Sequence, residues 1–263
     1  MDVNKVFAYE RKQQILDLLK IKKAISVEEL CKTLYTSGAT IRRDLQDLEK
    51  DRLIKRTHGG AVLLEGTSTE TPLVLRESEN SSQKQLISEL AVKHISDGMT
   101  LFFDSSSTVS YIIRQLHQFQ GLKVITNGIK TASLLSDYKN IKIYCTGGMI
   151  RDNSRSLVGH SAQAFIAQFN ADVCFMSCRG LSLEKGATDP SDEEAYIKKE
   201  YLSNSDKRIL LCDTTKIGVN YFCKVAPLHD FDYIITNSRE ATEKYNAYTR
   251  KSSHSSPVPG AEK

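Results

Sequence analysis

The chain has 263 residues, of which 40% are hydrophobic and 26% charged, a composition typical of globular proteins with a packed core. It contains no apolar run of roughly 18 residues, so the sequence predicts no membrane span, and the N-terminus lacks the apolar segment of a secretory signal. The length indicates one to two domains.

The formal net charge of +4 lies entirely in the first quarter of the chain. Residues 1–64 contain 13 of the 36 Lys and Arg and 9 of the 32 Asp and Glu, which leaves 23 of each (36 − 13 and 32 − 9) in residues 65–263. A basic head on a neutral body is the distribution expected of a nucleic-acid-binding domain joined to a larger one.

The six cysteines form no CxxC pair and have no histidines at zinc-finger spacing. The sequence therefore predicts no metal and no cofactor, and free cysteines favour a reducing, cytoplasmic compartment. Cys174 and Cys178 lie in an apolar run and are expected to be buried.

Three helices are predicted within the first 50 residues. Ser26 and Glu29 form a capping box at the start of the second helix, and Ser37 caps a third helix that reaches about Lys50. The short turn before the third helix makes a helix-turn-helix. The inward-facing residues are Ile15, Leu18, Leu19 and Ile21 on the first helix, Val27, Leu30, Cys31 and Leu34 on the second, and Ile41, Leu45 and Leu48 on the third.

The outward face of the third helix carries polar side chains that suit a DNA major groove. At about 100° per residue, Arg43 and Gln46 lie opposite the apolar stripe, with Thr40 and Arg42 on its flanks. Arg, Thr and Gln are residues that contact base edges and phosphates. The alternative is that the two arginines are solvated and pair with acidic residues of the same helix, Asp44, Asp47 and Glu49.

Residues 53–64 are predicted to form a strand, a glycine turn and a second strand, the pattern of a β-wing. Gly59 and Gly60 are expected to supply the positive φ of that turn. A basic wing gains affinity for DNA because phosphate contacts release counterions. The cations expected to contact phosphates are Lys55, Arg56 and His58 of the wing, with Lys22 and Lys23 at the end of the first helix.

The segments SGATIRRDL (37–45), LE (48–49) and IKRTHGGA (54–61) resemble the signature of the DeoR family of bacterial repressors. The family usually has a helix-terminating glycine where this chain has Arg52. Residues and resemblance both predict an α+β winged helix-turn-helix at 1–64 that binds double-stranded DNA. Its expected contact residues are Ser37, Thr40, Arg42, Arg43, Gln46, Lys55, Arg56 and His58.

The rest of the chain is predicted to form a linker at 65–82, an α/β domain at 83–245 and a disordered tail at 246–263. Helical and short apolar segments alternate in the domain, which indicates a largely parallel sheet. The expected strands are 99–103, 124–126, 141–145, 173–176, 208–211 and 233–236. The expected helices are 86–95, with Leu86, Leu90 and Ile95 inward, 109–116, 129–135, 162–169 and 193–202.

Polar loops follow four of the predicted strands. Asp104-Ser-Ser-Ser-Thr108 opens a helix, whose N-terminal amides suit a phosphate. Residues 126–128, 146–148 and 213–216 form the other three loops, and 146–148 lacks the glycine pattern of a P-loop or a dinucleotide site. Ligands bind beyond the carboxyl ends of parallel strands, so the four loops predict one binding site. The alternative for the first loop is an ordinary helix cap.

This body resembles the DeoR-family sensor domain in FFDSSST, ITNG, TGGMIRDNSRSLVG, EAYIK and DTTK, so that the whole resemblance covers about 6–236. The resemblance implies a ribose-phosphate-isomerase-like fold that binds a phosphorylated sugar. By position, it implies that Asp104, Ser105, Ser106, Ser107 and Thr108 hold the phosphate, that Asn127, Gly147, Gly148 and Arg151 line the pocket, and that Glu194, Lys198, Asp213 and Lys216 face the polyol. Ser106 replaces a glycine common in the family's loop.

These features predict a sequence-specific transcription regulator, a repressor of a sugar-metabolism operon that responds to a phosphorylated sugar. A homodimer or higher homo-oligomer in the cytoplasm, without membrane contact, is expected. One alternative is a sugar-phosphate isomerase or deaminase with an accessory DNA-binding head, in which Glu194, Lys198 and Asp213 transfer protons. Another is an activator, because the sign of regulation depends on operator placement.

Overall fold

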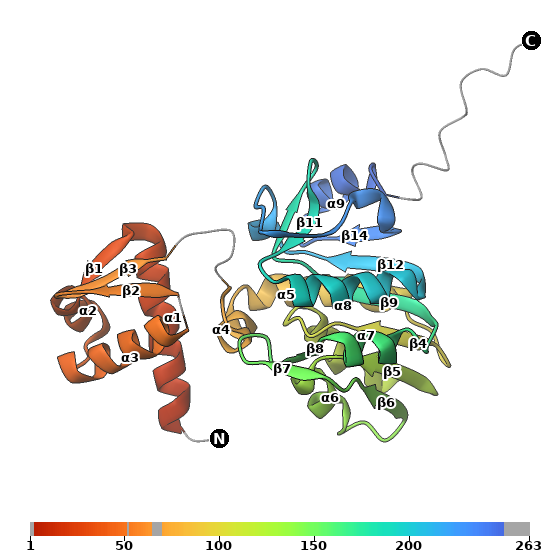
Figure 1. Cartoon of the computed structure of the whole chain (residues 1–263), viewed down its shortest axis with the longest axis horizontal. Helices are drawn as coiled ribbons and strands as arrows, with labels where there is room; N and C mark the ends of the chain where they lie inside the picture. Colours follow the sequence, from red (N-terminus) through yellow and green to blue (C-terminus); the bar gives the residue numbers. More distant parts are fainter. Residues whose placement is uncertain (1–2, 52, 65–69, 250–263) are drawn as a thin grey trace, which may run out of the picture. The chain divides into compact units, whose positions relative to one another are not determined.

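The computed structural model describes residues 3–51, 53–64 and 70–249, which form two compact units that divide between Arg76 and Glu77 (Figure 1). Arg52, where the chain departs from the family pattern, and residues 250–263 of the predicted tail lie outside the described residues. The first unit contains α1 (Val3–Lys22), β1 (Ala24–Ser26), α2 (Val27–Leu34), α3 (Gly38–Lys50), β2 (Ile54–Thr57), β3 (Gly60–Leu63) and the start of α4 (Leu73–Ser78).

Helices α1, α2 and α3 pack around one apolar core, as predicted. The buried residues include Ile15, Leu19, Leu30, Ile41, Leu45 and Leu48. Ser37 caps α3 by accepting from the Thr40 amide at 3.3 Å, and Ser26 caps α2 by accepting from the Glu29 amide at 3.1 Å. The second half of the predicted capping box is wrong, because the Glu29 carboxylate pairs with Lys22.

Ile21 does not join this core. Its side chain is 79% exposed, because position 21 lies about 200° around α1 from the buried Leu19. The prediction that it extends the apolar stripe of the first helix is therefore wrong.

The wing is a three-stranded antiparallel sheet in the order β1-β3-β2. Strand β1 was not predicted, and its position against β3 explains why residue 60 is a glycine. A Cβ atom there would lie 2.1 Å from the Ile25 carbonyl oxygen, so only glycine allows β1 to approach β3. Neither Gly59 nor Gly60 has a positive φ, and the predicted reason for these glycines is wrong.

The second unit is built on a six-stranded sheet in the order β14-β12-β9-β4-β5-β6, in which every neighbouring pair is parallel. This confirms the predicted parallel α/β fold. The strands are β4 (Thr100–Phe103), β5 (Leu122–Thr126), β6 (Ile141–Cys145), β9 (Ala171–Ser177), β12 (Ser205–Leu211) and β14 (Tyr233–Ile235).

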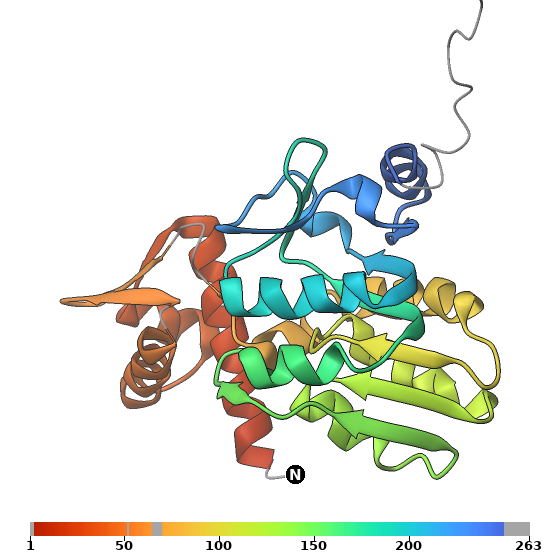
Figure 2. The same cartoon turned by 45° about the vertical axis from the view of Figure 1, so that its right-hand side comes forward.

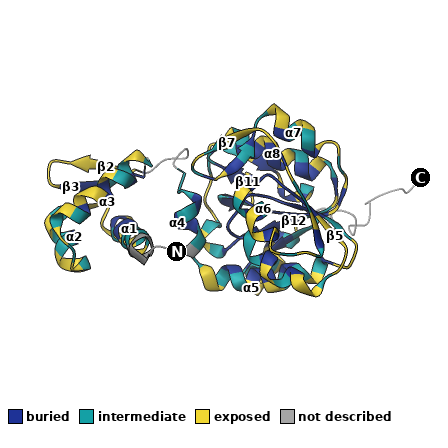
Figure 3. Ribbon diagram, turned by 90° about the horizontal axis from the view of Figure 1, so that it is seen from below, coloured by how far each residue is buried: buried dark blue, intermediate teal, exposed yellow. Residues whose placement is uncertain are grey.

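Helices cover both faces of this sheet (Figure 3). The main elements are α5 (Ser81–Ala91), the 3₁₀ helix η2 (Val109–Gln118), α6 (Ile129–Leu135), α7 (His160–Ile166), α8 (Asp192–Ser203) and α9 (Arg239–Asn246). Alternate strand residues divide between two cores. Phe102 and Cys174 belong to the core that includes residues of α7 and α8, whereas Phe103 and Phe175 belong to the core that includes residues of α5 and η2.

Two features of this unit differ from the expected helices. Leu86 is 43% exposed, and Ile87 and Ala91 of α5 face the core in its place. The segment 109–118 is a 3₁₀ helix rather than an α-helix, although its apolar residues Val109, Ile112, Ile113 and Leu116 are all buried. The remaining elements are two short sheets, β7 (Met149–Arg151) with β8 (Ser156–Val158), and β10 (Gly180–Ser182), β11 (Gly186–Asp189) and β13 (Cys223–Ala226), and the 3₁₀ turns η1 (Val92–His94), η3 (Thr214–Lys216) and η4 (Leu228–Asp230).

Parts of the predicted linker and tail are folded. Helix α4 and the first two residues of α5 lie within 65–82. The side chain of Asn246 bonds both the amide and the carbonyl of Ile234, and Thr249 is buried. Residues 246–249 therefore extend the fold of the second unit.

Candidate DNA-binding surface and ligand site

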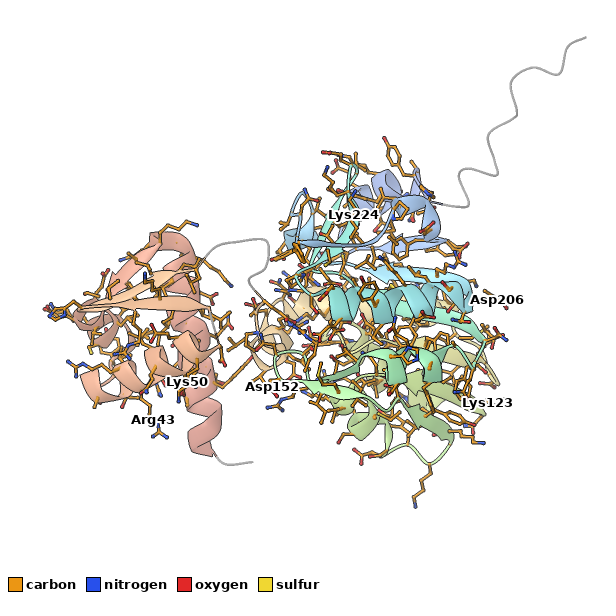
Figure 4. The ribbon with its side chains drawn as sticks, viewed as in Figure 1. Arg43, Lys50, Lys123, Asp152, Asp206 and Lys224 are labelled. Atoms are coloured by element: carbon orange, nitrogen blue, oxygen red, sulfur yellow. The ribbon has the colours of Figure 1, made fainter. Side chains whose placement is uncertain are left out.

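The outward side of α3 presents two unpaired arginines. Arg42 and Arg43 are exposed and have no ion-pair partner within the described part of the chain. Figure 4 shows the Arg43 side chain extending away from the ribbon of α3. Gln46 is also exposed, and Thr40 is half-buried. All four predicted base-contacting residues thus lie on α3 where a ligand can reach them.

Two of the three acidic residues of α3 are held by α1 and the third by the wing, which explains why the arginines are unpaired. Arg11 contacts both carboxylate oxygens of the buried Asp44, with its Nε 2.5 Å from Oδ2 and its Nη2 3.2 Å from Oδ1. Lys12 Nζ lies 2.5 Å from Asp47 Oδ2. The alternative in which Arg42 and Arg43 pair with neighbouring acids is therefore wrong.

The wing presents Lys55, Arg56 and His58 as exposed side chains on β2 and the following turn. Arg56 is partly engaged by Glu49, whose carboxylate accepts from the Arg56 amide at 2.8 Å and lies 3.8 Å from its guanidinium. Lys22 is similarly paired with Glu29. Exposed ion pairs contribute only about 0–1 kcal/mol, so DNA phosphates can compete for both cations.

The loop after β4 is shaped by Asp104. This buried carboxylate accepts hydrogen bonds from the amides of Ser106 and Ser177, both at 2.9 Å. Ser106 in turn accepts from the Val109 amide at 3.2 Å and so begins η2. Ser106 therefore caps the helix, and Asp104 fixes the loop to β9.

Three amides of the same loop, those of Ser105, Ser107 and Thr108, have no hydrogen-bond partner among the described residues. The buried Thr108 hydroxyl also lacks one. Buried polar groups are normally paired, so unpaired donors at a helix N-terminus indicate a place for an anion.

Glu194 joins the loop to the β7–β8 hairpin. Its carboxylate accepts from the Ser105 hydroxyl at 3.4 Å and from the Ser156 hydroxyl, and it lies 3.8 Å from Arg151 Nη1. Arg151 Nε also lies 2.7 Å from Glu193 Oε2. Ser156 is a member that the sequence analysis missed, because nothing in its local pattern separates it from other loop serines.

Lys198, one turn further along α8, is the centre of a buried charge cluster. Its Nζ donates to Asp189 Oδ2 at 2.5 Å and to the Ser177 carbonyl at 2.7 Å, and lies 3.7 Å from Asp104 Oδ2. Burial lowers the pKa of Lys198, but the carboxylates of Asp189, Asp104 and Glu194 outweigh burial and raise that pKa above its ordinary value. The cluster therefore contains a charged ammonium, and Asp189 is a second member that was not predicted.

Lys216 and Asp213 complete the set at the end of β12. Lys216 Nζ donates to Ser177 Oγ at 3.1 Å and lies 3.5 Å from Asp213 Oδ2. Burial raises the pKa of Asp213, but Lys216 and the Thr215 hydroxyl together lower it below its ordinary value. Asp213 is thus ionised at neutral pH.

The pocket-lining residues divide into two groups. Asn127 is buried, donates to the Leu157 carbonyl and accepts from the Tyr201 hydroxyl, both at 3.2 Å. Leu157 follows Ser156, so Asn127 and the Glu194 cluster share the β7–β8 hairpin. Gly147 and Gly148 are exposed, and no described contact connects them to the other predicted residues. The structure therefore brings the residues predicted for the site together, except for these two glycines.

Comparison with known families gives two matches in chain order. Residues 11–67 match the DeoR-like helix-turn-helix domain, and residues 79–238 match the DeoR C terminal sensor domain. No helix of the described residues is long and apolar enough to cross a membrane.

Proteins that are similar to this chain over almost their whole length are named as transcription regulators. The HTH-type transcriptional regulator GolR of Listeria innocua is 36% identical, covering 89% of this chain and 92% of its own. The HTH-type transcriptional repressor GlcR of Bacillus subtilis is 33% identical over 88% and 89%. The Glycerol-3-phosphate regulon repressor of Escherichia coli is 28% identical over 87% and 90%.

Among solved structures, ribose 5-phosphate isomerase A from Methanocaldococcus jannaschii aligns with 53% of this chain and 55% of its own, at 16% identity and a TM-score of 0.40. That likeness is too distant to support an isomerase activity.

Proposed function

Because this chain belongs to the DeoR family of HTH-type transcriptional regulators, we propose that it represses a sugar-metabolism operon by binding operator DNA through α3 and the wing. A phosphorylated sugar bound at the loop after β4 modulates that binding. Family membership favours this function over a sugar-phosphate isomerase or deaminase. The regulator works in the cytoplasm as a homodimer or higher homo-oligomer that binds repeated half-sites.

The observation that supports DNA binding is the division of charge between α1 and α3. Arg11 and Lys12 neutralise Asp44 and Asp47 and Arg56 engages Glu49, so Arg42 and Arg43 of the recognition helix are left without an acidic partner among the described residues. Base contacts from Arg43 and its neighbours then specify sequence, and wing cations add phosphate contacts.

The test uses a duplex selected from a random pool with the full chain. Arg43→Ala should weaken binding to the selected duplex by about 1–3 kcal/mol and relax its sequence preference. Lys55→Ala should reduce the slope of log affinity against log salt by about one. Lys50→Ala, which removes an exposed cation at the end of the same helix, is the matched control. Equal affinity for selected and random duplexes would refute the proposal.

The ligand site is supported by its unsatisfied donors. The free amides of the 105–108 loop and the Thr108 hydroxyl suit phosphate oxygens, and Lys216 adds a cation at the neighbouring strand end. Asp104 contributes by holding the loop, because its oxygens are already engaged by amides.

Phosphorylated three- to six-carbon sugars and polyols should be screened for a rise in the melting temperature. A compound that raises the melting temperature of the wild-type chain should no longer raise it in Lys216→Ala or in Thr108→Val. It should still raise it in Lys123→Ala, the control at an exposed lysine. The same compound should change the affinity for the selected duplex, because regulation requires a ligand that distinguishes DNA-competent from incompetent states. A shift that persists in both site variants contradicts the assignment.

A further inference from the structure

A cavity lies in the larger unit, and none of the residues predicted for the sugar-phosphate site lines it. Its volume is about 850 Å³, in the range of small-molecule sites. It is bounded by the β10–β11 turn, the C-terminal end of α8, β12, β13 and η4. Both its size and its position are unexplained by the proposed function.

The lining of this cavity is cationic. Four cations and two carboxylates contribute to it, which gives an excess of two positive charges with His229 neutral. Lys185 pairs with Glu184 at 2.5 Å. The other three cations are Lys199, Arg208 and Lys224. None of them has a carboxylate oxygen within 4.0 Å among the residues that the structure describes. Figure 4 marks Lys224 on β13. Unpaired cations around one cavity favour an anionic ligand.

Arg208 gives a second, independent indication. Its Nε is buried without a hydrogen-bond partner in the described structure, while Nη1 donates to the Asp230 carbonyl at 3.5 Å. A buried donor without an acceptor is unfavourable. An anion in the cavity would meet the guanidinium at Nη2, which has no hydrogen-bond partner among the described residues and, unlike Nε, is not fully buried.

The same cavity offers apolar surface beside the cations. Leu183 and Tyr248 line it and are 43% and 54% exposed. An exposed aromatic ring stacks on a planar ligand group. We propose that this cavity binds a nucleoside di- or triphosphate, with its phosphates among Lys199, Arg208 and Lys224 and its base against Tyr248.

The experiment is calorimetric titration of the full chain with ADP, ATP and inorganic tripolyphosphate. Lys199→Glu and Lys224→Glu should each weaken ADP binding about tenfold or more, whereas Lys123→Glu, a charge reversal at an exposed lysine of β5, should not. Tyr248→Ala should weaken ADP but leave tripolyphosphate unchanged. Lys216→Ala should leave ADP binding intact, which separates this cavity from the sugar-phosphate site.

Absence of saturable ADP and ATP binding at millimolar concentration overturns the proposal. So does a loss in Lys123→Glu equal to that in Lys224→Glu, or a loss in Lys216→Ala. The placement of the base against Tyr248 is overturned if tripolyphosphate binds with the same affinity as ADP and Tyr248→Ala leaves the affinity for ADP unchanged. Melting curves of the charge-reversal variants establish that each is folded before it is titrated.

Discussion

Replacing Lys198 with methionine tests the buried charge cluster directly. The substitution keeps the length and apolar stem of the side chain but removes the ammonium between Asp189 and Asp104. The Lys198 and Asp189 side chains are 7% and 4% exposed, so solvent cannot replace the missing cation. Removing one partner of such a buried pair costs about 3–5 kcal/mol, against about 0–1 kcal/mol for an exposed pair. We therefore expect Lys198→Met to lower the free energy of unfolding by about 4 kcal/mol at neutral pH.

The pH dependence of this loss follows from Asp189. Burial already raises the pKa of its carboxyl group, and Lys198 opposes that rise. Without Lys198 the folded-state pKa rises further above the unfolded value. A group of this kind stabilises the fold at low pH and loses that contribution as the pH rises through its folded pKa. The deficit of Lys198→Met should therefore shrink by up to about 1.4 kcal/mol per unit as the pH falls from 8 to 5.

Urea unfolding followed by circular dichroism at pH 5, 6, 7 and 8 measures this deficit, with the transition of the larger unit compared between variants. Lys123→Met is the control for loss of an exposed lysine. Adding Asp189→Asn to Lys198→Met should restore stability at pH 8 and have little effect at pH 5. A deficit below about 1 kcal/mol at pH 7, or one equal at pH 5 and pH 8, would refute the reasoning.

Three further predictions concern packing and positioning. Gly60→Ala should destabilise the head by about 3 kcal/mol because its Cβ meets the Ile25 carbonyl, whereas Gly59→Ala, which meets no atom within 4 Å, should be neutral or slightly stabilising in thermal unfolding. Arg11→Ala and Asp44→Ala should show a coupling energy of about 2 kcal/mol in a double-mutant cycle of urea unfolding, and additive effects would contradict the clamp on α3. Tyr201→Phe should cost about 1–2 kcal/mol because Asn127 Oδ1 loses its buried donor; an unchanged melting temperature would show that this bond contributes nothing.

The sequence predicted the helices and strands that bury one face, because their apolar residues recur at regular spacing along the chain. Residues 129–135 and 141–145 match α6 and β6, because a short apolar strand and an amphipathic helix leave local patterns in the sequence. Strand β1 was missed because three residues between two helices are too few to show a hydrophobic period. Only their pairing with β3 makes them a strand, in the sheet that Figure 2 shows from a second side. Helix α9 was missed because its sequence is mostly polar, and one buried side chain, Tyr245, faces the core.

The candidate ligand site shows the same limit. Resemblance placed Asp104, Glu194 and Lys198 together, and the structure does bring them into one network. Their partners Asp189 and Ser156 could not be read from the sequence, because each reaches the site across a tertiary contact. Nor could a motif show that Asp104 binds loop amides, since that depends on where β9 ends.

Helix α8 contributes residues to both proposed sites of the larger unit. Lys198 faces the buried cluster, while the next residue, Lys199, lines the cationic cavity about 100° around the same helix. Strand β12 has a similar arrangement, with Arg208 in its middle at the cavity and Asp213 just beyond its C-terminal end at the proposed sugar-phosphate site. Because packed helices and strands move as rigid elements, we expect a ligand that shifts α8 to act on both proposed sites. Any coupling must be reciprocal: a nucleotide that changes the affinity for a sugar phosphate must have its own affinity changed by the same factor.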